Sequence, residues 1–244
     1  MRLPVIQGVI DRRILANYRV DPAVLAQQLP APFRPKVVRG WGMAGICLIR
    51  LKQLRPMLAP AALGLSSENA AHRIAVEWDS AAGVQEGVYI KRRDTSSRLA
   101  AVAGGRLFPG VHRHARFLVD ETADSFHVRM ASDDGTTHIE IKTRRADDLP
   151  PSSLFASVEE ASEFFAAGSL GYSATAQPTR YEGLELRCRD WRVEPLATSV
   201  VSSSDFDDPV RFPPGSIEFD HALLMRGVAH QWHGRPAMSC GTFA

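Results

Sequence analysis

The chain has 244 residues, of which 45% are hydrophobic and 23% are charged, and this composition is ordinary for a soluble globular protein with a buried core. Its formal net charge of +2 is too small for the concentrated basic surface that nucleic-acid binding requires. The three cysteines form no CxxC pair, and the apolar runs in the sequence are too short for us to expect a signal peptide or a membrane-spanning helix. We therefore expect one domain over residues 1–244 in the cytoplasm, with no nucleic-acid or membrane partner.

Helix signals are few and short. Asp21 followed by proline predicts a helix over AVLAQQL. Residues 94–95 are candidates to cap a second helix over SSRLAAVA, which the double glycine after it would end. Ser157 and Glu160 have the spacing of a capping box, and they predict a third helix that ends at Gly168.

Strand signals dominate the rest of the chain. Apolar and polar residues alternate with period two in HRIAVEW (72–78), over 126–130, over 138–141 and over 217–224. In LELRCRDWRV (184–193) the alternation shifts, which indicates a bulge. Many strands with three short helices favour a mainly β chain with a single closed or sandwiched sheet.

The stretch GGRLFPGVHRHARF (104–117) places basic side chains where a strand begins. On a strand His112 and His114 point to the same face, and such a pair can hold a metal ion in a β-barrel. The glutamate that usually completes such a site does not follow closely, because Glu121 comes late. We expect no metal and no other cofactor, and the simpler interpretation is a pair of hydrogen-bonded histidines on a half-exposed strand.

Two further charged positions allow a functional and a purely structural interpretation. Glu68 in SSEN lies just before a predicted strand, where a carboxylate is either a solvated loop charge or an acid/base group in a pocket. Arg93 lies in KRRDTSSR, which is either a solvated helix start with Asp94 paired to an arginine, or a clamp for an anion.

An ordered set of segments resembles the DUF2071 (YqjF-like) family over nearly all of the chain: VIDRRILANYRVDPAVLAQQLPAPF, GICLIRL, SENAAHRIAVEW, EGVYI, RRDTSSR, AGGRLFPGVHRHARF, GSLGY and EFDHALLMRG. That family is similar in turn, more distantly, to acetoacetate decarboxylase. The superfamily resemblance implies an antiparallel, β-barrel-like cone around a closed pocket.

The resemblance to acetoacetate decarboxylase also implies site positions. Glu68 lies where the decarboxylase has a pocket glutamate, and Arg12 and Arg13 lie near the position of its N-terminal arginine. His112 and Arg113 fall on its two lysines, the first of which forms a Schiff base with the ketone. Neither an imidazole nor a permanently protonated guanidinium can form that imine, so the chain departs from the decarboxylase at its central residue. We therefore exclude Schiff-base decarboxylation.

Strand alternation disagrees with this alignment about which side chain enters the pocket. Arg113 has the same parity as Ala115 and Phe117, on the more apolar face. If that face lines the pocket, Arg113 enters it and His112 points outward, whereas a bulge at 109–110 would reverse the assignment. Both arrangements stay open at this point.

The resulting hypothesis is a small-molecule pocket protein that acts on a small keto or enol acid without an amine intermediate, by lyase, isomerase or hydratase chemistry. His112 and Glu68 would exchange protons with the carbon skeleton. The carboxylate would be held by arginines from this set: Arg12, Arg13, Arg93 and Arg113. The alternatives are a non-catalytic small-ligand binding protein and a metal-dependent enzyme that uses His112 and His114. A homo-oligomer is a further hypothesis, with no number of subunits implied.

Overall fold

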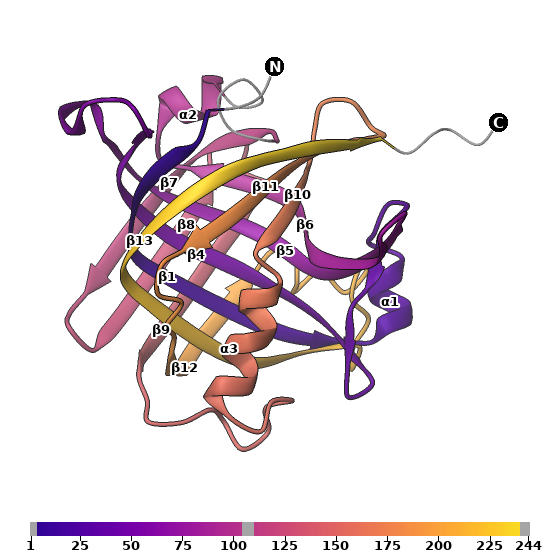
Figure 1. Cartoon of the computed structure of the whole chain (residues 1–244). Helices are drawn as coiled ribbons and strands as arrows, with labels where there is room; N and C mark the ends of the chain where they lie inside the picture. The colour runs from indigo at the N-terminus through magenta and orange to yellow at the C-terminus, as the bar shows by residue number, and fades with distance from the viewer. Residues whose placement is uncertain (1–3, 104–109, 240–244) are drawn as a thin grey trace.

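The computed structural model describes residues 4–103 and 110–239, and the prediction of a mainly β chain is confirmed (Figure 1). The helices are α1 (Pro22–Ala26), α2 (Arg98–Ala103) and α3 (Val158–Ala167), with a short 3-10 helix η1 (Ala61–Leu63). The strands are β1 (Ile6–Val20), β2 (Arg34–Pro35), β3 (Val37–Val38), β4 (Trp41–Pro56), β5 (Leu65–Ser80), β6 (Gly83–Thr95), β7 (His112–Glu121), β8 (Ser125–Ser132), β9 (His138–Arg145), β10 (Leu170–Ala174), β11 (Arg180–Cys188), β12 (Glu194–Ser203) and β13 (Ile217–Ser239). Within the described ranges, no helix combines the length and the apolar character needed to cross a membrane.

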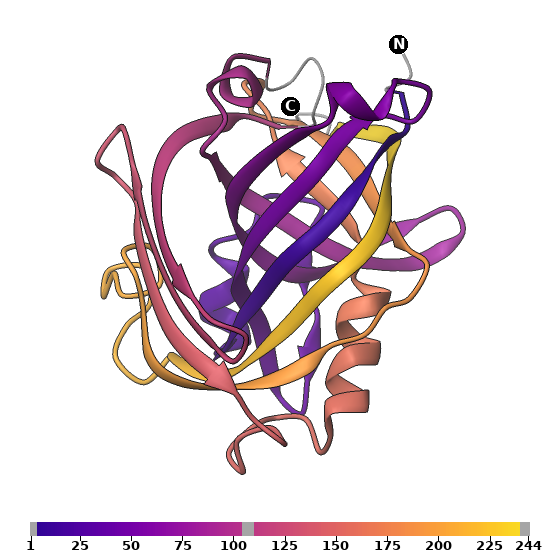
Figure 2. The same ribbon diagram turned by 90° about the vertical axis from the view of Figure 1, so that its left-hand side faces the viewer.

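The strand pairings return on themselves and form two closed circuits that share β13, β1, β4, β5 and β6. The larger circuit continues from β6 through β7, β8, β9 and β12 back to β13, and Figure 2 shows its curved strands. The smaller circuit continues from β6 through β10 and β11 back to β13. We expected an antiparallel sheet, but β6 pairs in parallel with both β7 and β10, so the sheet is mixed. The crossover that a parallel pair requires places α2 between β6 and β7.

The shared strands are buried on both faces, which is why a single chain can build two compartments. One hydrophobic cluster combines residues of the shared strands with residues of β7, β8, β9 and β12. The other lies on the opposite face and includes Ala161 and Phe165 of α3. In β4 the two faces alternate: Ala44, Ile46 and Leu48 belong to the first cluster, and Met43, Cys47 and Ile49 to the second.

Two predicted helix caps are confirmed. The Asp21 carboxylate accepts hydrogen bonds from the backbone N–H groups of the first turn of α1. Ser157 Oγ accepts a hydrogen bond from Glu160 N at 3.2 Å, and α3 ends at Gly168, as the capping box predicted.

Two local predictions are wrong. Residues 94–95 do not cap α2, because they stay paired with β5 as the end of β6, and Ser97 Oγ accepts the hydrogen bond from Ala100 N instead. The predicted end of this helix at 104–105 lies outside the described residues. The shift of alternation in 184–193 is no bulge, because β11 ends at Cys188 and the chain bends there.

Candidate functional site

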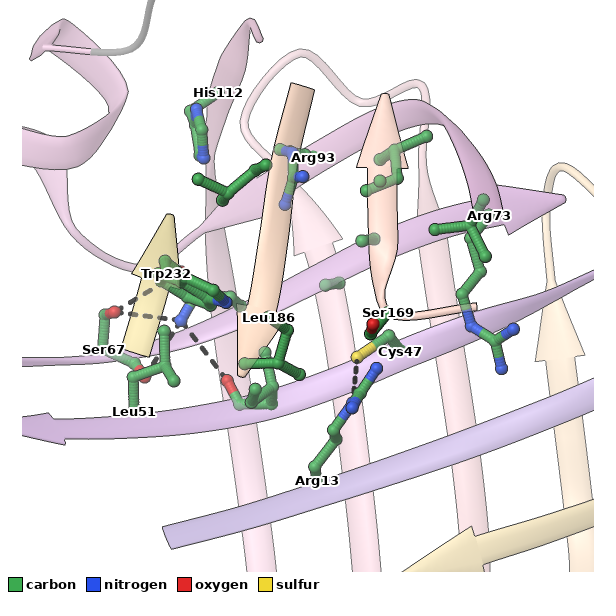
Figure 3. A pocket seen from close by; sticks show the side chains of 18 of the residues that line it. Arg13, Cys47, Leu51, Ser67, Arg73, Arg93, His112, Ser169, Leu186 and Trp232 are labelled. Atoms are coloured by element: carbon green, nitrogen blue, oxygen red, sulfur yellow. Dashed lines mark hydrogen bonds between the residues drawn. The ribbon is translucent and has the colours of Figure 1, made fainter. Parts of the chain in front are cut away.

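A cavity of about 130 Å³ lies inside the smaller circuit, and residues from all seven strands of that circuit line it (Figure 3). The volume suits a ligand of about the size of benzene. Apolar side chains such as Ile49, Leu51 and Leu186 make up part of the wall. The more polar side chains are Arg13, Cys47, Ser67, Asn69, Arg73, Arg93, His112, Ser169 and Trp232.

Strand geometry brings these polar groups together from distant parts of the chain. On β5 the polar residues that line the cavity all have odd numbers, because successive side chains of a strand point to opposite faces: Ser67, Asn69 and Arg73. Between β6 and β7 the parallel register places Arg93 opposite His112, so their side chains lie next to each other on the same side of the sheet (Figure 3). The site is therefore a product of tertiary pairing and of no single motif.

Arg13 and Arg93 are held at the cavity wall by neutral groups. Arg13 Nε donates to Cys47 Sγ at 3.2 Å, and its guanidinium carbon lies 5.3 Å from the centroid of the Trp191 ring. Arg93 Nε donates to Ser173 Oγ at 3.0 Å. Arg13 Nη1 is buried and has no hydrogen-bond partner among the described residues.

Arg73 is the most enclosed of the three cavity arginines, with 4% of its surface exposed. It donates to Asn17 Oδ1 and lies over the Phe165 ring, 4.9 Å from the centroid. Burial lowers the pKa of Arg73 and of Arg93 to about 10, so both remain cationic at neutral pH. No aspartate or glutamate lies among the described residues that line the cavity. The cavity thus holds buried positive charge without a protein counter-ion in its described lining.

His112 lies beside Arg93 and is neutral at neutral pH. Its ring Nδ1 donates to the Gly110 carbonyl at 3.3 Å, which leaves the basic lone pair on Nε2. Burial, and after it the charge of Arg93, lowers the pKa of His112 to about 4, against the opposing effect of the Gly110 carbonyl.

Comparison with known protein families assigns the sequence to a family. The profile of the DUF2071 family, described as an uncharacterized conserved protein, matches residues 10–218. The chain belongs to the DUF2071 family. No curated protein matches its sequence.

Solved structures place this DUF2071 chain in the acetoacetate decarboxylase-like fold. An acetoacetate decarboxylase-like enzyme from Sphingomonas wittichii RW1 is 14% identical, with 98% of this chain and 93% of that chain covered and a TM-score of 0.58. Acetoacetate decarboxylase from Legionella pneumophila subsp. pneumophila str. Philadelphia 1 is 11% identical, with coverages of 99% and 90% and a TM-score of 0.61. The enduracididine biosynthesis enzyme MppR complexed with pyruvate is 12% identical, with coverages of 96% and 90% and a TM-score of 0.57. At these identities the likeness concerns the fold.

Of the residues that the sequence singled out in this DUF2071 chain, the cavity brings together Arg13, Arg93 and His112. Glu68 and Arg12 are not among them. Arg12 donates to Glu68 at 2.6 Å and to Glu121 at 2.7 Å, in an ion-pair cluster outside the described cavity lining. The reason is strand alternation, because Ser67 and Asn69 face the cavity and the side chain between them faces the other way. The structure does not place Glu68 where it could share a ligand with His112.

Arg113 is also outside the cavity. Its side chain is half exposed and forms an ion pair with Asp134, with a distance of 2.6 Å between Arg113 Nη1 and Asp134 Oδ2. Its parity does match Ala115, as the sequence indicated, but Ala115 packs in the cluster of the larger circuit. Of the two arrangements that the sequence left open, the structure has His112 at the cavity and Arg113 outside it, because the apolar face of β7 belongs to the other compartment.

A second, larger hollow at the Arg113 side of the sheet is charge-compensated. Lys91 pairs with Asp205 at 2.9 Å, and Arg211 pairs with the same carboxylate. Arg92 pairs with Asp94 at 2.8 Å. Arg93 lines this hollow as well as the cavity, but its hydrogen bond goes to the neutral Ser173 hydroxyl.

His114 does not join His112 in a metal site. Its Nδ1 lies 2.7 Å from the Asp133 carboxylate, at the molecular surface. Within the described residues, no group of three or more histidine, cysteine, aspartate or glutamate side chains could hold a metal ion.

Sequence reasoning missed Arg73, Cys47 and Asn69 of this DUF2071 site. Arg73 lies inside HRIAVEW, where its alternation with Ile74 made it look like the wetter face of a half-exposed strand. The signal available was the cluster of polar residues at odd positions of SENAAHR, opposite an apolar strand that is buried on both faces.

Proposed function

We propose that this protein binds a small organic anion, of the keto or enol acid class, in the cavity of the smaller circuit. The observation that carries the proposal is the set of three cavity arginines, Arg13, Arg73 and Arg93, whose hydrogen-bond partners are a thiol, an amide and a hydroxyl. Burying a cation without a counter-ion is costly, and a carboxylate ligand supplies the missing charge. A guanidinium also matches a carboxylate with two parallel hydrogen bonds.

The chemistry we propose is proton transfer at the carbon next to the keto group, with His112 as the proton carrier. His112 Nε2 takes a proton from that carbon, the electron pair of the C–H bond forms the enolate, and the proton returns to carbon or oxygen from the imidazolium. Neighbouring guanidinium groups stabilise the developing enolate oxygen. A bound anion offsets the charge of Arg93, which after burial is the second cause of the lowered pKa of His112, and so favours proton uptake by the imidazole.

An amine mechanism has no support in the cavity, because lysine is absent from its described lining. Lys36 is close to this region, but its Nζ pairs with Glu86 at 2.5 Å. Enolisation, and the lyase, isomerase and hydratase reactions that begin with it, therefore suit these residues better than imine formation.

Proteins of the same fold guide the choice of probe. MppR has been described in complex with pyruvate, and other structures of this fold are acetoacetate decarboxylases, so small keto acids are the class to test first. Pyruvate also fits the cavity by size.

The test is exchange of the methyl protons of pyruvate for deuterium in D₂O, followed by proton NMR. We expect the wild-type protein to accelerate exchange above the buffer rate and His112→Ala to lose the acceleration. His114→Ala is the matched control, because that ring pairs with Asp133 away from the cavity, and it should retain exchange. Equal exchange by wild type and His112→Ala would contradict the role of His112.

A non-catalytic binding protein is the second candidate function. It is favoured by the composition of the described cavity lining, which offers three arginines to hold an anion. To move protons the same lining offers a single histidine and no carboxylate. Pyruvate that binds, stabilises the protein and is recovered without deuterium would support this alternative.

A further inference from the structure

A chain of buried polar side chains stands behind Arg73. Asn17 and His221 have no exposed surface, and Asp220 is 1% exposed. Asp220 Oδ1 lies 2.5 Å from His221 Nδ1, and His221 Nε2 lies 3.0 Å from Asn17 Nδ2. Asn17 Oδ1 then accepts the hydrogen bond from Arg73 Nη2. Four consecutive polar groups thus run from the protein interior to the cavity wall.

The direction of every hydrogen bond in this chain follows from Arg73. A guanidinium only donates, so the Asn17 atom that faces it is the oxygen. The Asn17 amide nitrogen therefore faces His221, and it also donates to the Leu15 carbonyl at 3.2 Å. His221 Nε2 must accept, which makes the ring neutral with its proton on Nδ1, where it donates to Asp220.

Asp220 lies at the far end of this series of hydrogen-bonded side chains. Its carboxylate accepts hydrogen bonds from Ser153 Oγ at 2.8 Å and from Leu154 N at 2.9 Å, besides that from His221. Burial opposes ionisation of this carboxyl, but these hydrogen bonds outweigh it and hold the pKa of Asp220 below its ordinary value.

Local features of the strands make room for these groups. The register between β1 and β13 shifts next to Asn17, so that Asn17 faces His221, Tyr18 faces Phe219, and Asp220 is left over in a bulge. Opposite Asn17 on β4 stands Gly45, where a Cβ would lie 2.5 Å from the Ala16 carbonyl oxygen and 3.2 Å from Asn17 Oδ1.

Helix α3 closes this region. The ring of Phe165 lies 5.8 Å from the His221 ring and 4.9 Å from the Arg73 guanidinium carbon. Phe155 packs edge-on against His221 as well, with 5.4 Å between the ring centroids. The apolar cover keeps water from replacing any member of the chain.

We infer that Asn17, His221 and Asp220 are positioning residues of the proposed anion site, and that they hold the Arg73 guanidinium at the cavity wall while leaving its charge available to the ligand. The inference rests on the proposed function. Its central element is the neutral amide at position 17, because a carboxylate there would form an ion pair with Arg73 and compete with the ligand. The carboxylate of this series, Asp220, is instead two side chains away, and it lies 3.5 Å from Arg19 Nη1, with which it forms an ion pair.

The experiment is a calorimetric titration of the full-length protein with pyruvate and with pyruvamide, its neutral amide. Asn17→Asp keeps the size of the side chain and adds a charge. We expect it to weaken pyruvate binding by about tenfold to a hundredfold, the range for a hydrogen-bonded charge, and to leave pyruvamide binding nearly unchanged. A role in folding alone would lower both affinities together.

Asp220→Asn is the second variant. It tests the relay, by which we mean the hydrogen-bonded series Arg73–Asn17–His221–Asp220, from its far end. The amide can donate to His221 Nδ1 and shift the ring proton to Nε2, which turns Asn17 and presents its NH₂ group to Arg73. We expect a selective loss of pyruvate affinity and a change of His221 from the Nδ1–H to the Nε2–H tautomer in ¹⁵N NMR spectra.

Each outcome decides one of the two claims. Wild-type protein that binds neither pyruvate nor another keto acid overturns the proposed function, and the role of the relay with it. If the wild-type protein and Asn17→Asp prefer pyruvate over pyruvamide to the same extent, the inference about Asn17 is overturned and the proposed function stands. If Asn17→Asp does not fold, the tautomer of His221 in the wild-type protein decides. An Nε2–H tautomer overturns the inference. An Nδ1–H tautomer, together with loss of the preference for pyruvate over pyruvamide in Asp220→Asn, supports the inference.

Discussion

Folding alone does not explain why three positive charges stand at one cavity without a carboxylate partner in its described lining: Arg13, Arg73 and Arg93. Each is held by a neutral partner in a cavity that includes apolar walls. Elsewhere in the molecule buried arginines do have counter-ions, as Arg12 does with Glu68 and Glu121. Groups that destabilise the folded protein, such as unpaired buried charges, are expected where a protein holds a ligand.

Replacing Arg93 tests this interpretation through stability. Arg93→Met removes a buried, uncompensated charge and keeps most of the side-chain length, so we expect the free energy of unfolding of the ligand-free protein to rise by on the order of 1 kcal/mol. The same variant should bind pyruvate at least about tenfold more weakly. Urea unfolding and calorimetry measure the two effects.

Arg113→Met is the matched control for that variant. Arg113 is half exposed and paired with Asp134, so its loss should change stability by less than about 1 kcal/mol and leave pyruvate binding intact. An Arg93→Met protein that is less stable and binds pyruvate normally would contradict the interpretation.

Three histidines whose pKa is lowered by burial predict how stability depends on pH. Burial lowers the pKa of His72, His112 and His230 to about 4, from an ordinary value of 6.5. Between these values the unfolded chain binds protons that the folded chain does not, so the free energy of unfolding falls as the pH falls from about 6.5 to about 4. Each histidine contributes up to about 1.4 kcal/mol per pH unit.

Urea unfolding at several pH values measures this slope, and His112→Asn should make it shallower. Carboxyl groups whose pKa lies below its ordinary value, such as that of Asp220, lose their contribution at lower pH and do not dominate this window. A stability that stays flat from pH 6.5 to 4 would rule out buried neutral histidines.

At the scale of single elements, α3 was well predicted because its signals are local. The capping box and the terminal glycine act within one helix turn and need no tertiary contact. The helix matters to the site because Phe165 touches both Arg73 and His221.

Ser157→Ala removes the cap of α3, and we expect it to lower the free energy of unfolding by about 1 kcal/mol. Thermal or urea unfolding measures the loss, with Glu163→Gln on the exposed side of the same helix as the control. A variant as stable as wild type would show that packing, and not the cap, defines where α3 begins.

Strands were predicted less completely, for a physical reason. Alternation identifies a buried face only when the other face meets water, but β4 is buried on both sides over most of its length. On β5 the pattern of Ile74, Val76 and Trp78 did identify one core correctly. It gave no sign that Arg73 also faces an enclosed space.

At the scale of the whole molecule, two circuits share five strands, and this is what the sequence could not reveal. Parity assigned Arg113 to an apolar face and His112 to the opposite one, and the structure agrees with both assignments. Which face belongs to the ligand cavity depends on the pairing of β6 with β7 and β10, strands far apart in the chain. The resemblance to the decarboxylase singled out His112, which lines the cavity, and Glu68, which lies outside the described cavity lining.

The proposed function requires that the cavity bind a small anion through its arginines. The most direct measurement is a calorimetric comparison of pyruvate and pyruvamide binding to the wild-type protein and to Arg73→Gln. We predict that the wild-type protein binds pyruvate at least about tenfold more tightly than pyruvamide, and that Arg73→Gln abolishes most of this preference. Equal affinities for the charged and the neutral ligand in the wild-type protein would show that the arginines do not select an anion.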